Sequence, residues 1–389
     1  MVGAAIVLAG RKSGGAGIPY VPAVDSQVLE RVPAGRSDPA AREIQELRRT
    51  LATDPKNVRI ATAFAQRNIE EARVTSDPRY LGHAQAALAP WWGDSLPPPD
   101  VLLLRATIRQ SLHEFDSALV DLDVLLRATP DDPQAWLTRS VVLTVRGEYG
   151  EAKKSCEPLL RLAGDLVSAQ CVAVIESLTG DAHQAYDRLR TAFAKNPAPT
   201  ANEAGWILSS LGEISIRAGD DAGGEANYRA ALRANPLDAY TLAAYADLLL
   251  DLGRPMEVLP RLRGHENDDG LLLRLALAEK IVRAPEADRH VELLRSRHAS
   301  SVARGDVVHR REQSRFVLML GGEPMRALDL AVANWAVQKE PWDARIVLES
   351  ALAARKPDAA YPVVEFLASN RAEEPRLLAL ATRVREAHQ

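Results

Sequence analysis

The stretch "RGEYGEAKKSCEPLL", Arg146 to Leu160, carries a glycine, an aromatic residue two positions later and an alanine three positions after that. An earlier stretch, "LHEFDSALVDLDVLL", repeats the aromatic residue and the alanine at a distance of 34 residues, with Phe115 in place of Tyr149 and Ala118 in place of Ala152. This distance is the length of a unit in which two antiparallel helices pack on each other and on the next unit. The sequence therefore predicts a repeated helix pair.

These offsets resemble the tetratricopeptide repeat (TPR). In that pattern Gly147 ends the first helix in a conformation that is costly for residues with a Cβ atom, Tyr149 fills the gap between the helices, and Ala152 lets two backbones approach closely. The resemblance implies an all-α fold, a TPR-like α-solenoid built as a right-handed superhelix of antiparallel helix pairs. The C-terminal sequence is also similar to that of uncharacterised bacterial TPR-containing proteins, some of them exported. This resemblance implies no activity.

The repeat register divides the chain into four parts. The clearest units begin at residues 99, 133, 205 and 239, and the insert "APTANEA" precedes the unit at 205. The predicted parts are a flexible N-terminal lead (1–37), an N-terminal cap with a divergent helical repeat (38–98), well-defined TPR units (99–263), and degenerate helical repeats with a C-terminal cap (264–389).

Composition limits the classes of partner. The chain is 47% hydrophobic and 26% charged, as in folded proteins, and only 5% aromatic, which suits helices rich in alanine and leucine. Its net charge is -4, so it has no basic footprint for nucleic acid or for anionic lipid. We expect no nucleic-acid partner, and the apolar segment at the start is too short for a membrane span.

The first ten residues, "MVGAAIVLAG", leave the compartment open. The apolar run is followed, not preceded, by the positive charges of Arg11 and Lys12, which reverses the order found in secretory signals. The preferred interpretation is a truncated start of an exported, periplasmic protein, in which the lead is the remnant of a signal sequence. The alternative is a disordered tail of a cytoplasmic protein.

The two cysteines, Cys156 and Cys171, fall on neighbouring predicted helices. Two thiols without a histidine at ligand spacing do not make a metal site. A disulfide is one alternative in an oxidising compartment, and a pair of buried apolar thiols is the favoured one.

Motifs for bond chemistry are missing from the sequence, which contains no HExxH, GxSxG, GxxxxGK[ST] or GxGxxG. The acidic residues Glu266, Asp268 and Asp269 do not have the spacing of a calcium-binding EF-hand loop, and we interpret them as part of a solvated loop. His290 and His298 are eight positions apart and do not share one helical face, so we expect surface histidines. The sequence predicts no enzyme, no cofactor and no metal.

The inner, concave surface of the superhelix is the predicted binding site. In TPR arrays it is lined by fixed positions of the first helix of each unit. In the units that begin at residues 205 and 239 these positions include Trp206, Glu213, Arg217, Tyr240, Asp247 and Asp251. The lysine and asparagine with which some TPR domains hold chaperone C-termini are replaced here by Leu103 and Thr107. We expect a protein or peptide partner with an apolar anchor and a basic residue. The alternative is that these side chains only cover a surface.

A second candidate patch lies near the C-terminus. It contains His309, Arg311, Glu312, Arg315, Trp342 and Asp343. The favoured interpretation is a set of salt bridges between repeats around packed tryptophans, and the alternative is the site of an enzyme or sensor subunit. The sequence thus predicts a non-catalytic scaffold or adaptor for protein–protein interaction.

Overall fold

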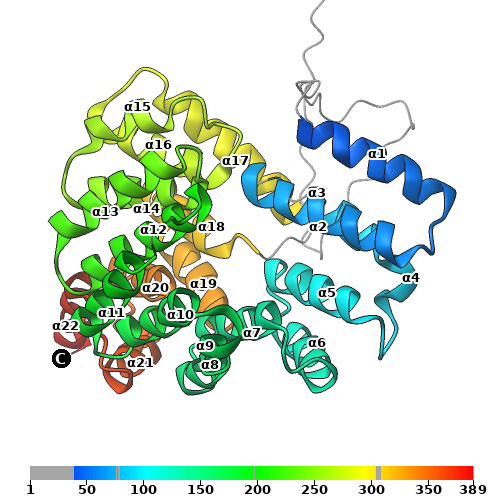
Figure 1. Cartoon of the computed structure of the whole chain (residues 1–389). Helices are drawn as coiled ribbons and strands as arrows, with labels where there is room; N and C mark the ends of the chain where they lie inside the picture. Colours follow the sequence, from blue (N-terminus) through cyan, green and yellow to red (C-terminus); the bar gives the residue numbers. More distant parts are fainter. Residues whose placement is uncertain (1–38, 76, 78, 197, 304–307, 389) are drawn as a thin grey trace, which may run out of the picture.

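The computed structural model describes residues 39–75, 77, 79–196, 198–303 and 308–388. Throughout these residues the regular structure is helical, without strands, and the helices follow one another in an extended, curved array (Figure 1). The predicted all-α solenoid is confirmed. The expected flexible lead, residues 1–37, lies outside the described residues.

Successive helices form antiparallel pairs along most of the chain. The N-terminal part contains α1 (Pro39–Thr53), α2 (Val58–Thr75), α3 (Arg79–Ala87) and α4 (Ala89–Trp92). The central part contains α5 (Pro99–Ser111), α6 (Phe115–Ala128), α7 (Pro133–Val145), α8 (Tyr149–Cys156), α9 (Leu159–Ala163), α10 (Asp165–Leu178), α11 (Ala182–Ala194), α12 (Ala201–Arg217), α13 (Asp221–Ala234), α14 (Ala239–Asp251), the short 3₁₀ helix η1 (Pro255–Glu257) and α15 (Leu259–Leu262).

The C-terminal part continues the same architecture. Its elements are α16 (Asp269–Val282), α17 (Ala287–Ala303), α18 (Arg310–Phe316), the π-helical turn η2 (Val317–Gly321), α19 (Pro324–Trp335), α20 (Pro341–Ala353), the 3₁₀ helix η3 (Pro357–Ala360), α21 (Tyr361–Ser369) and α22 (Pro375–His388). None of the helices in the described part of the chain has the length and apolar character that a membrane crossing requires.

The structure explains the residues of the repeat. Gly147 has φ +77° in the turn between α7 and α8, a conformation that favours glycine. Tyr149 and Ala152 are both buried, and the Ser140 hydroxyl donates a hydrogen bond to the carbonyl oxygen of Ala152 at 3.1 Å. At the start of α7, the Asp132 side chain accepts from the backbone N–H of Ala135 at 3.0 Å, which satisfies one of the free donors of the first turn.

One boundary differs from the prediction. The insert "APTANEA" was expected to precede the helix, but α12 begins within it, at Ala201. Thr200 and Glu203 form a capping box, in which each side chain bonds the other residue's backbone N–H, at 3.2 Å and 2.8 Å. This reciprocal cap starts the helix earlier than the apolar repeat pattern does.

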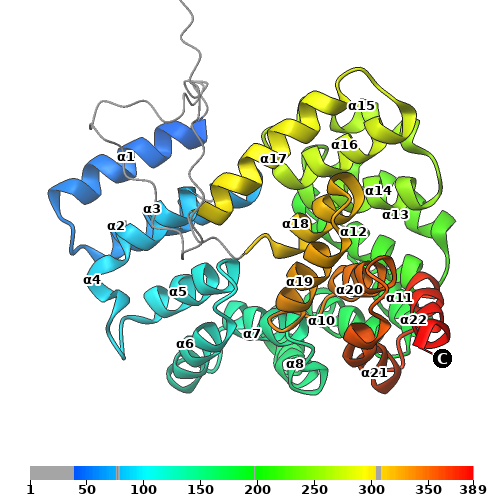
Figure 2. The same ribbon diagram turned by 180° about the vertical axis from the view of Figure 1, so that it is seen from behind.

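The C-terminal helices return to the middle of the array. Figures 1 and 2 show α20, α21 and α22 beside α10 and α11. The backbone N–H of Lys339 donates to the carbonyl of Val145 at 2.7 Å, and the guanidinium of Arg371 donates to the carbonyl of Thr179 at 3.0 Å. Both acceptors lie at the C-terminal ends of first helices, α7 and α10. The C-terminal segment therefore covers the turns of the central units.

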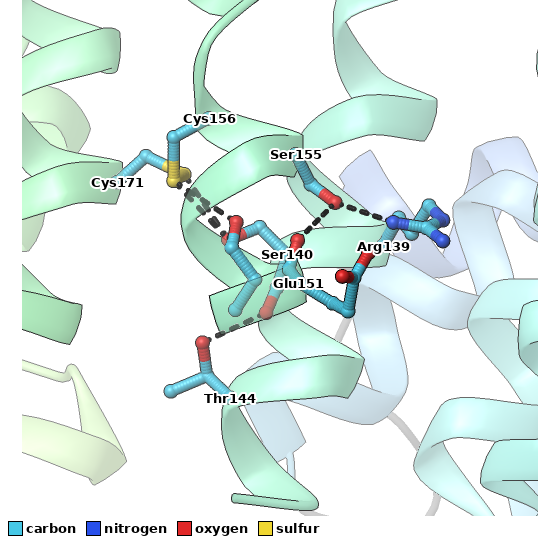
Figure 3. The surroundings of a disulfide bond; sticks show 8 residues. Arg139, Ser140, Thr144, Glu151, Ser155, Cys156 and Cys171 are labelled. Atoms are coloured by element: carbon cyan, nitrogen blue, oxygen red, sulfur yellow. Dashed lines mark hydrogen bonds between the residues drawn. A yellow bond between two sulfur atoms is a disulfide. The ribbon is translucent and has the colours of Figure 1, made fainter. Parts of the chain in front are cut away.

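A disulfide joins two neighbouring units, so the favoured prediction of two free thiols is wrong. Cys156, at the end of α8, is bonded to Cys171 on α10, with their Cα atoms 5.7 Å apart (Figure 3). Both residues are buried, and the Ser140 hydroxyl lies 3.3 Å and 3.2 Å from the two sulfur atoms. The packing of α8 on α10 brings the two Cα atoms within bridging distance.

The substitution Gly147→Ala tests how closely the C-terminal helices pack on the turn between α7 and α8. A Cβ atom there would lie 2.8 Å from the ring of Phe366 on α21, whereas Gly253, with φ +68°, has nothing within 4 Å. We expect Gly253→Ala to cost about 1–2 kcal/mol from the left-handed backbone alone, and Gly147→Ala to cost at least about 1 kcal/mol more because of the added contact. Urea unfolding of both variants measures the difference.

A helical glycine provides the matched control for this comparison. Gly150 lies inside α8 with nothing within 4 Å of an added Cβ, so Gly150→Ala should stabilise the fold by about 0.5–1 kcal/mol. Equal losses for Gly147→Ala and Gly253→Ala would show that Phe366 does not pack on this turn.

Candidate functional site

The predicted aromatic pair lies on the first helices of two adjacent units. Trp206 on α12 is 41% exposed and Tyr240 in the first turn of α14 is 63% exposed. The helices are tied together behind these rings, because the Thr241 and Ser209 hydroxyl oxygens are 3.0 Å apart. The Tyr240 hydroxyl donates to the carboxylate of Glu213 on α12. Two adjacent helices thus hold two large rings that remain open to solvent.

Polar groups of α12 form a network next to these rings. Arg217 donates to Glu213 at 3.0 Å and to the Ser177 hydroxyl on α10 at 2.9 Å. The negative charge of Glu213, together with desolvation and the charge of Glu340, raises the pKa of Tyr240 well above its usual value. The Tyr240 hydroxyl therefore lies beside a carboxylate that Arg217 also contacts.

Asp247 is part of the buried structure of α14. It is 4% exposed, and its carboxylate accepts from Arg274 on α16 at 2.7 Å and from Arg315 on α18 at 2.7 Å. Burial alone would raise the pKa of Asp247, but the charges and hydrogen bonds of the two arginines outweigh it and lower the pKa. The carboxylate predicted to contact a partner already has two partners within the chain.

Asp251 lies one turn further along α14 and pairs with arginines of α20 and α22. Arg345 on α20 donates to both carboxylate oxygens at 2.7 Å. Arg376 on α22 lies 3.4 Å from the same carboxylate and also pairs with Asp221 at 2.8 Å. The assignment of Asp247 and Asp251 to partner binding stays a prediction, and the contacts that the structure gives them are internal.

Trp342 lies between two of these arginines. The guanidinium carbons of Arg315 and Arg345 are each 4.3 Å from the centre of its ring. We call these three residues the arginine–tryptophan stack. Cation–π contacts of this kind contribute about 0.5–2 kcal/mol each, and the two aspartates of α14 fix the arginines in place.

The remaining residues of the predicted C-terminal patch gather beside the stack. Arg311 lies 2.7 Å from Glu340 and 3.5 Å from the fully buried Asp343. The amides of Asn334 and Gln338 donate to Asp343 at 2.7 Å and 3.2 Å. Burial raises the pKa of Asp343 to about 7, although Arg311 opposes this. This group of charges is satisfied by other groups of the chain.

Two predicted residues lie at the edge of this patch. Glu312 follows Arg311 on α18 and pairs with it at 3.2 Å. His309 is exposed at the start of α18, and its charge contributes to a lowered pKa of Glu312. The structure therefore brings the predicted arginines, acids and tryptophan together and leaves the histidine at the rim.

Space for a ligand is small where the C-terminal helices meet the central units. The cavity there has a volume of about 30 Å³ and is lined by residues that include Tyr149, Arg217, Glu340, Phe366 and Glu374. A volume of this size holds about one water molecule. Within the residues that the structure describes, no group of three or more His, Cys, Asp or Glu side chains is placed to hold a metal ion.

The acidic loop and the histidines have structural contacts. Asp268 caps α16 by accepting from the Leu271 N–H at 2.9 Å, and Asp269 pairs with Arg297. His290 was expected at the surface, but it is buried and its Nδ1 lies 2.6 Å from the Glu279 carboxylate. That prediction is wrong because α17 packs His290 onto α16, a contact that helical spacing within α17 does not reveal.

Three solved structures have a similar fold. TTC0263, a thermophilic TPR protein in Thermus thermophilus, is 18% identical with a TM-score of 0.40, over 48% of this chain and 99% of that one. The APC/C hetero-tetramer Cut9–Hcn1 is 14% identical with a TM-score of 0.49, over 89% of this chain and 66% of that one. A TPR protein from Parabacteroides merdae is 13% identical with a TM-score of 0.37, over 74% of this chain and 98% of that one.

The helix pairs of the described residues give the chain a TPR-like fold. No protein-family model and no curated protein matches its sequence. The similarity between this TPR-like protein and the solved structures concerns the fold alone.

Sequence reasoning missed the arginines that complete the site. Arg274 and Arg376 carry no motif, and their carboxylate partners on α14 are 27 and 125 positions away in the chain. The one usable signal was the pair of aspartates one helical turn apart, at 247 and 251, on a face that the repeat register turns inward. Two carboxylates on such a face require cations nearby.

Removing the central ring should loosen the C-terminal half of this TPR-like protein. We expect Trp342→Ala to lower the free energy of unfolding by about 2–4 kcal/mol, somewhat below a fully buried aromatic because the ring is only partly buried. Trp206→Ala is the control, with an expected loss below about 1 kcal/mol, since that ring is exposed. Urea unfolding measures both, and equal losses would contradict a structural role of the stack.

Glu312 gives the protein a dependence on acid pH. Burial favours its neutral form, but the charges of Arg311 and Arg274 outweigh this and lower its pKa to about 2, from a reference value of 4.5. Because the folded-state pKa is depressed, ionised Glu312 stabilises the fold above about pH 4.5, and this contribution is lost as the pH falls towards 2.

We therefore expect Glu312→Gln to lower the free energy of unfolding by about 1–3 kcal/mol at pH 7. The difference from the parent should shrink steadily between pH 4.5 and 3. Urea unfolding at a series of pH values gives the curve, with Glu365→Gln, an exposed position on α21, as the control. A difference that stays constant with pH would rule out the depressed pKa.

Proposed function

We propose that this protein is a non-catalytic interaction scaffold whose partner, a protein or peptide segment, binds across α12 and α14 with Trp206 and Tyr240 as its anchoring contacts. The observation that carries the proposal is the exposure of these two rings on adjacent first helices. Tyr228 and Tyr245, on α13 and α14, are almost fully buried. Tyrosine and tryptophan are the residues that most often supply binding energy at interfaces.

Charge supports a partner that carries a lysine or arginine beside an apolar anchor. Glu213 and Glu340 both raise the pKa of Tyr240. Asp247 and Asp251 are engaged with arginines of the chain. Glu213 is the acid in direct contact with Tyr240 and also accepts from Arg217 at 3.0 Å, so a basic group of the partner would share this carboxylate. Complementary charges of this kind select partners and speed association more than they add affinity.

The C-terminal patch supports a structural role over catalysis. Arg311, Arg315 and Arg345 each face a carboxylate within hydrogen-bonding distance, at 2.7 Å. A catalytic group needs a polar atom available to a substrate. We therefore assign the binding function to the aromatic pair and the shaping of the array to the patch.

Selection from a random peptide-display library on the immobilised full chain tests the proposal. We expect enrichment of peptides with an aromatic or large aliphatic residue near a lysine or arginine. A selected peptide should bind Trp206→Ala/Tyr240→Ala at least about tenfold more weakly by fluorescence polarisation, with an unchanged melting temperature because both rings are exposed.

Two other exposed apolar residues provide the matched control. Ile281 and Met319 are 61% and 57% exposed on α16 and η2, and Ile281→Ala/Met319→Ala should leave peptide affinity unchanged. Full affinity of the aromatic double variant, or a library without enrichment, would remove this surface as the binding site.

The disulfide supports an oxidising compartment for this function. Structural disulfides persist mainly outside the reducing cytosol, and Cys156 and Cys171 are bonded within the core of the array. We expect protein isolated from its host under alkylating conditions to carry no free thiol by mass spectrometry. Alkylation of both cysteines would contradict this compartment without bearing on the aromatic pair.

A further inference from the structure

An open pocket lies between the central helices, away from the aromatic pair. It has a volume of about 390 Å³ and is lined by seven residues of α6, α7 and α8. No residue of the C-terminal helices lines it. Pockets of about 300–1,000 Å³ are the usual size for small ligands, so this one has room for a compact molecule or one large side chain.

The apolar part of the pocket consists of Leu126 on α6 and Trp136 on α7. The indole N–H of Trp136 donates to the carbonyl oxygen of Pro130 at 2.8 Å. Trp136 also packs against the cores on both sides of α7. The ring is therefore held in place, and a fixed aromatic surface costs little conformational entropy when a flat group stacks on it.

Three cations and two carboxylates line the rest of the pocket. Arg139 donates to Asp123 at 2.9 Å, and Lys154 pairs with Glu151 at 2.6 Å on the same helix. Arg127 is exposed and, within the part of the chain that the structure describes, has no hydrogen-bonding or ion-pair partner. One positive charge is thus left without a counter-ion.

Arg139 is positioned by the disulfide-linked unit. Its guanidinium donates to the Ser155 hydroxyl at 2.7 Å, next to Cys156 (Figure 3). This bond and the Asp123 contact hold Arg139 in place in the lining of the pocket, so Arg127 remains the group available to an incoming anion.

We propose that this pocket binds an aromatic carboxylate. The ring lies on Trp136 and Leu126, and the carboxylate accepts from the guanidinium of Arg127, whose planar geometry suits bidentate contact with two oxygens. Lys154 lines the same pocket, paired with Glu151. The inference rests on neither the aromatic pair of α12 and α14 nor the proposed partner.

The test uses 2-naphthoate as the probe and the indole N–H signal of Trp136 as the readout. The signal is assigned by its loss in Trp136→Phe and followed in two-dimensional ¹H–¹⁵N spectra of the full chain. We expect a saturable shift with 2-naphthoate, and at least about tenfold weaker binding of the neutral 2-naphthamide and of 2-naphthoate to Arg127→Gln. Arg127 is exposed and unpaired, so its variant keeps the fold.

Lys153 provides the matched control. It neighbours Lys154 but pairs with Glu176 at 3.1 Å and does not line the pocket, so Lys153→Gln should bind 2-naphthoate like the parent. Equal affinity of the acid and the amide, equal affinity of the Arg127 and Lys153 variants, or an unmoved Trp136 signal would overturn the proposal.

Two further probes distinguish the sources of an aromatic carboxylate. A peptide that ends in tryptophan with a free carboxylate tests the C-terminus of a protein, and its amidated form is the control. Binding of 2-naphthoate without the peptide assigns the pocket to a small acid. Tighter binding of the free-carboxylate peptide than of its amide assigns the pocket to a C-terminal aromatic residue.

Discussion

Two carboxylates one turn apart on α14 organise the C-terminal half of the protein. Asp247 is buried, where an unpaired charge is costly, and Asp251 lies one turn away at the exposed end of the helix. Their partners are Arg274, Arg315, Arg345 and Arg376, one from each of α16, α18, α20 and α22. The helices α16, α18, α20 and α22 therefore each bring one arginine to α14, two to each aspartate, and these ion pairs are compatible only with a curved array. Buried ion pairs contribute little net stability compared with apolar packing, but they select one arrangement among many.

The curvature decides which surfaces remain open. Because the later units curl around α14, the helices α20 to α22 cover the turns of α7 and α10, with the bonds from Lys339 to Val145 and from Arg371 to Thr179. The C-terminal helices therefore cover the inner face of the array near the C-terminal ends of α7 and α10. Trp206 and Tyr240 lie outside the covered part and keep their rings exposed. The two aspartates therefore have structural contacts within the chain. The two rings stay exposed and are the candidate binding groups.

The pocket of the central units depends on contacts between neighbouring repeats. It is lined by the second helices of two units, α6 and α8, and by α7 between them in the chain. The disulfide from α8 to α10 and the bond from Arg139 to Ser155 hold one wall of this pocket. Neighbour-to-neighbour contacts of this kind are the unit of stability in solenoids, and here they also position charged side chains.

Short-range features of the fold were determined by the sequence. Gly147, Tyr149 and Ala152 occupy the turn, the gap and the close contact that their spacing predicts, and Pro99, Pro133 and Ala239 begin helices where the repeat register places them. Backbone conformation, capping and packing within one pair involve residues a few positions or one repeat apart, so a sequence pattern can reveal them. The tertiary structure decided the disulfide, the burial of His290 and the pairing of four arginines with the two aspartates of α14. Those contacts depend on the rotation between successive units, which accumulates over up to 125 residues and is set by the packing of every interface along the way.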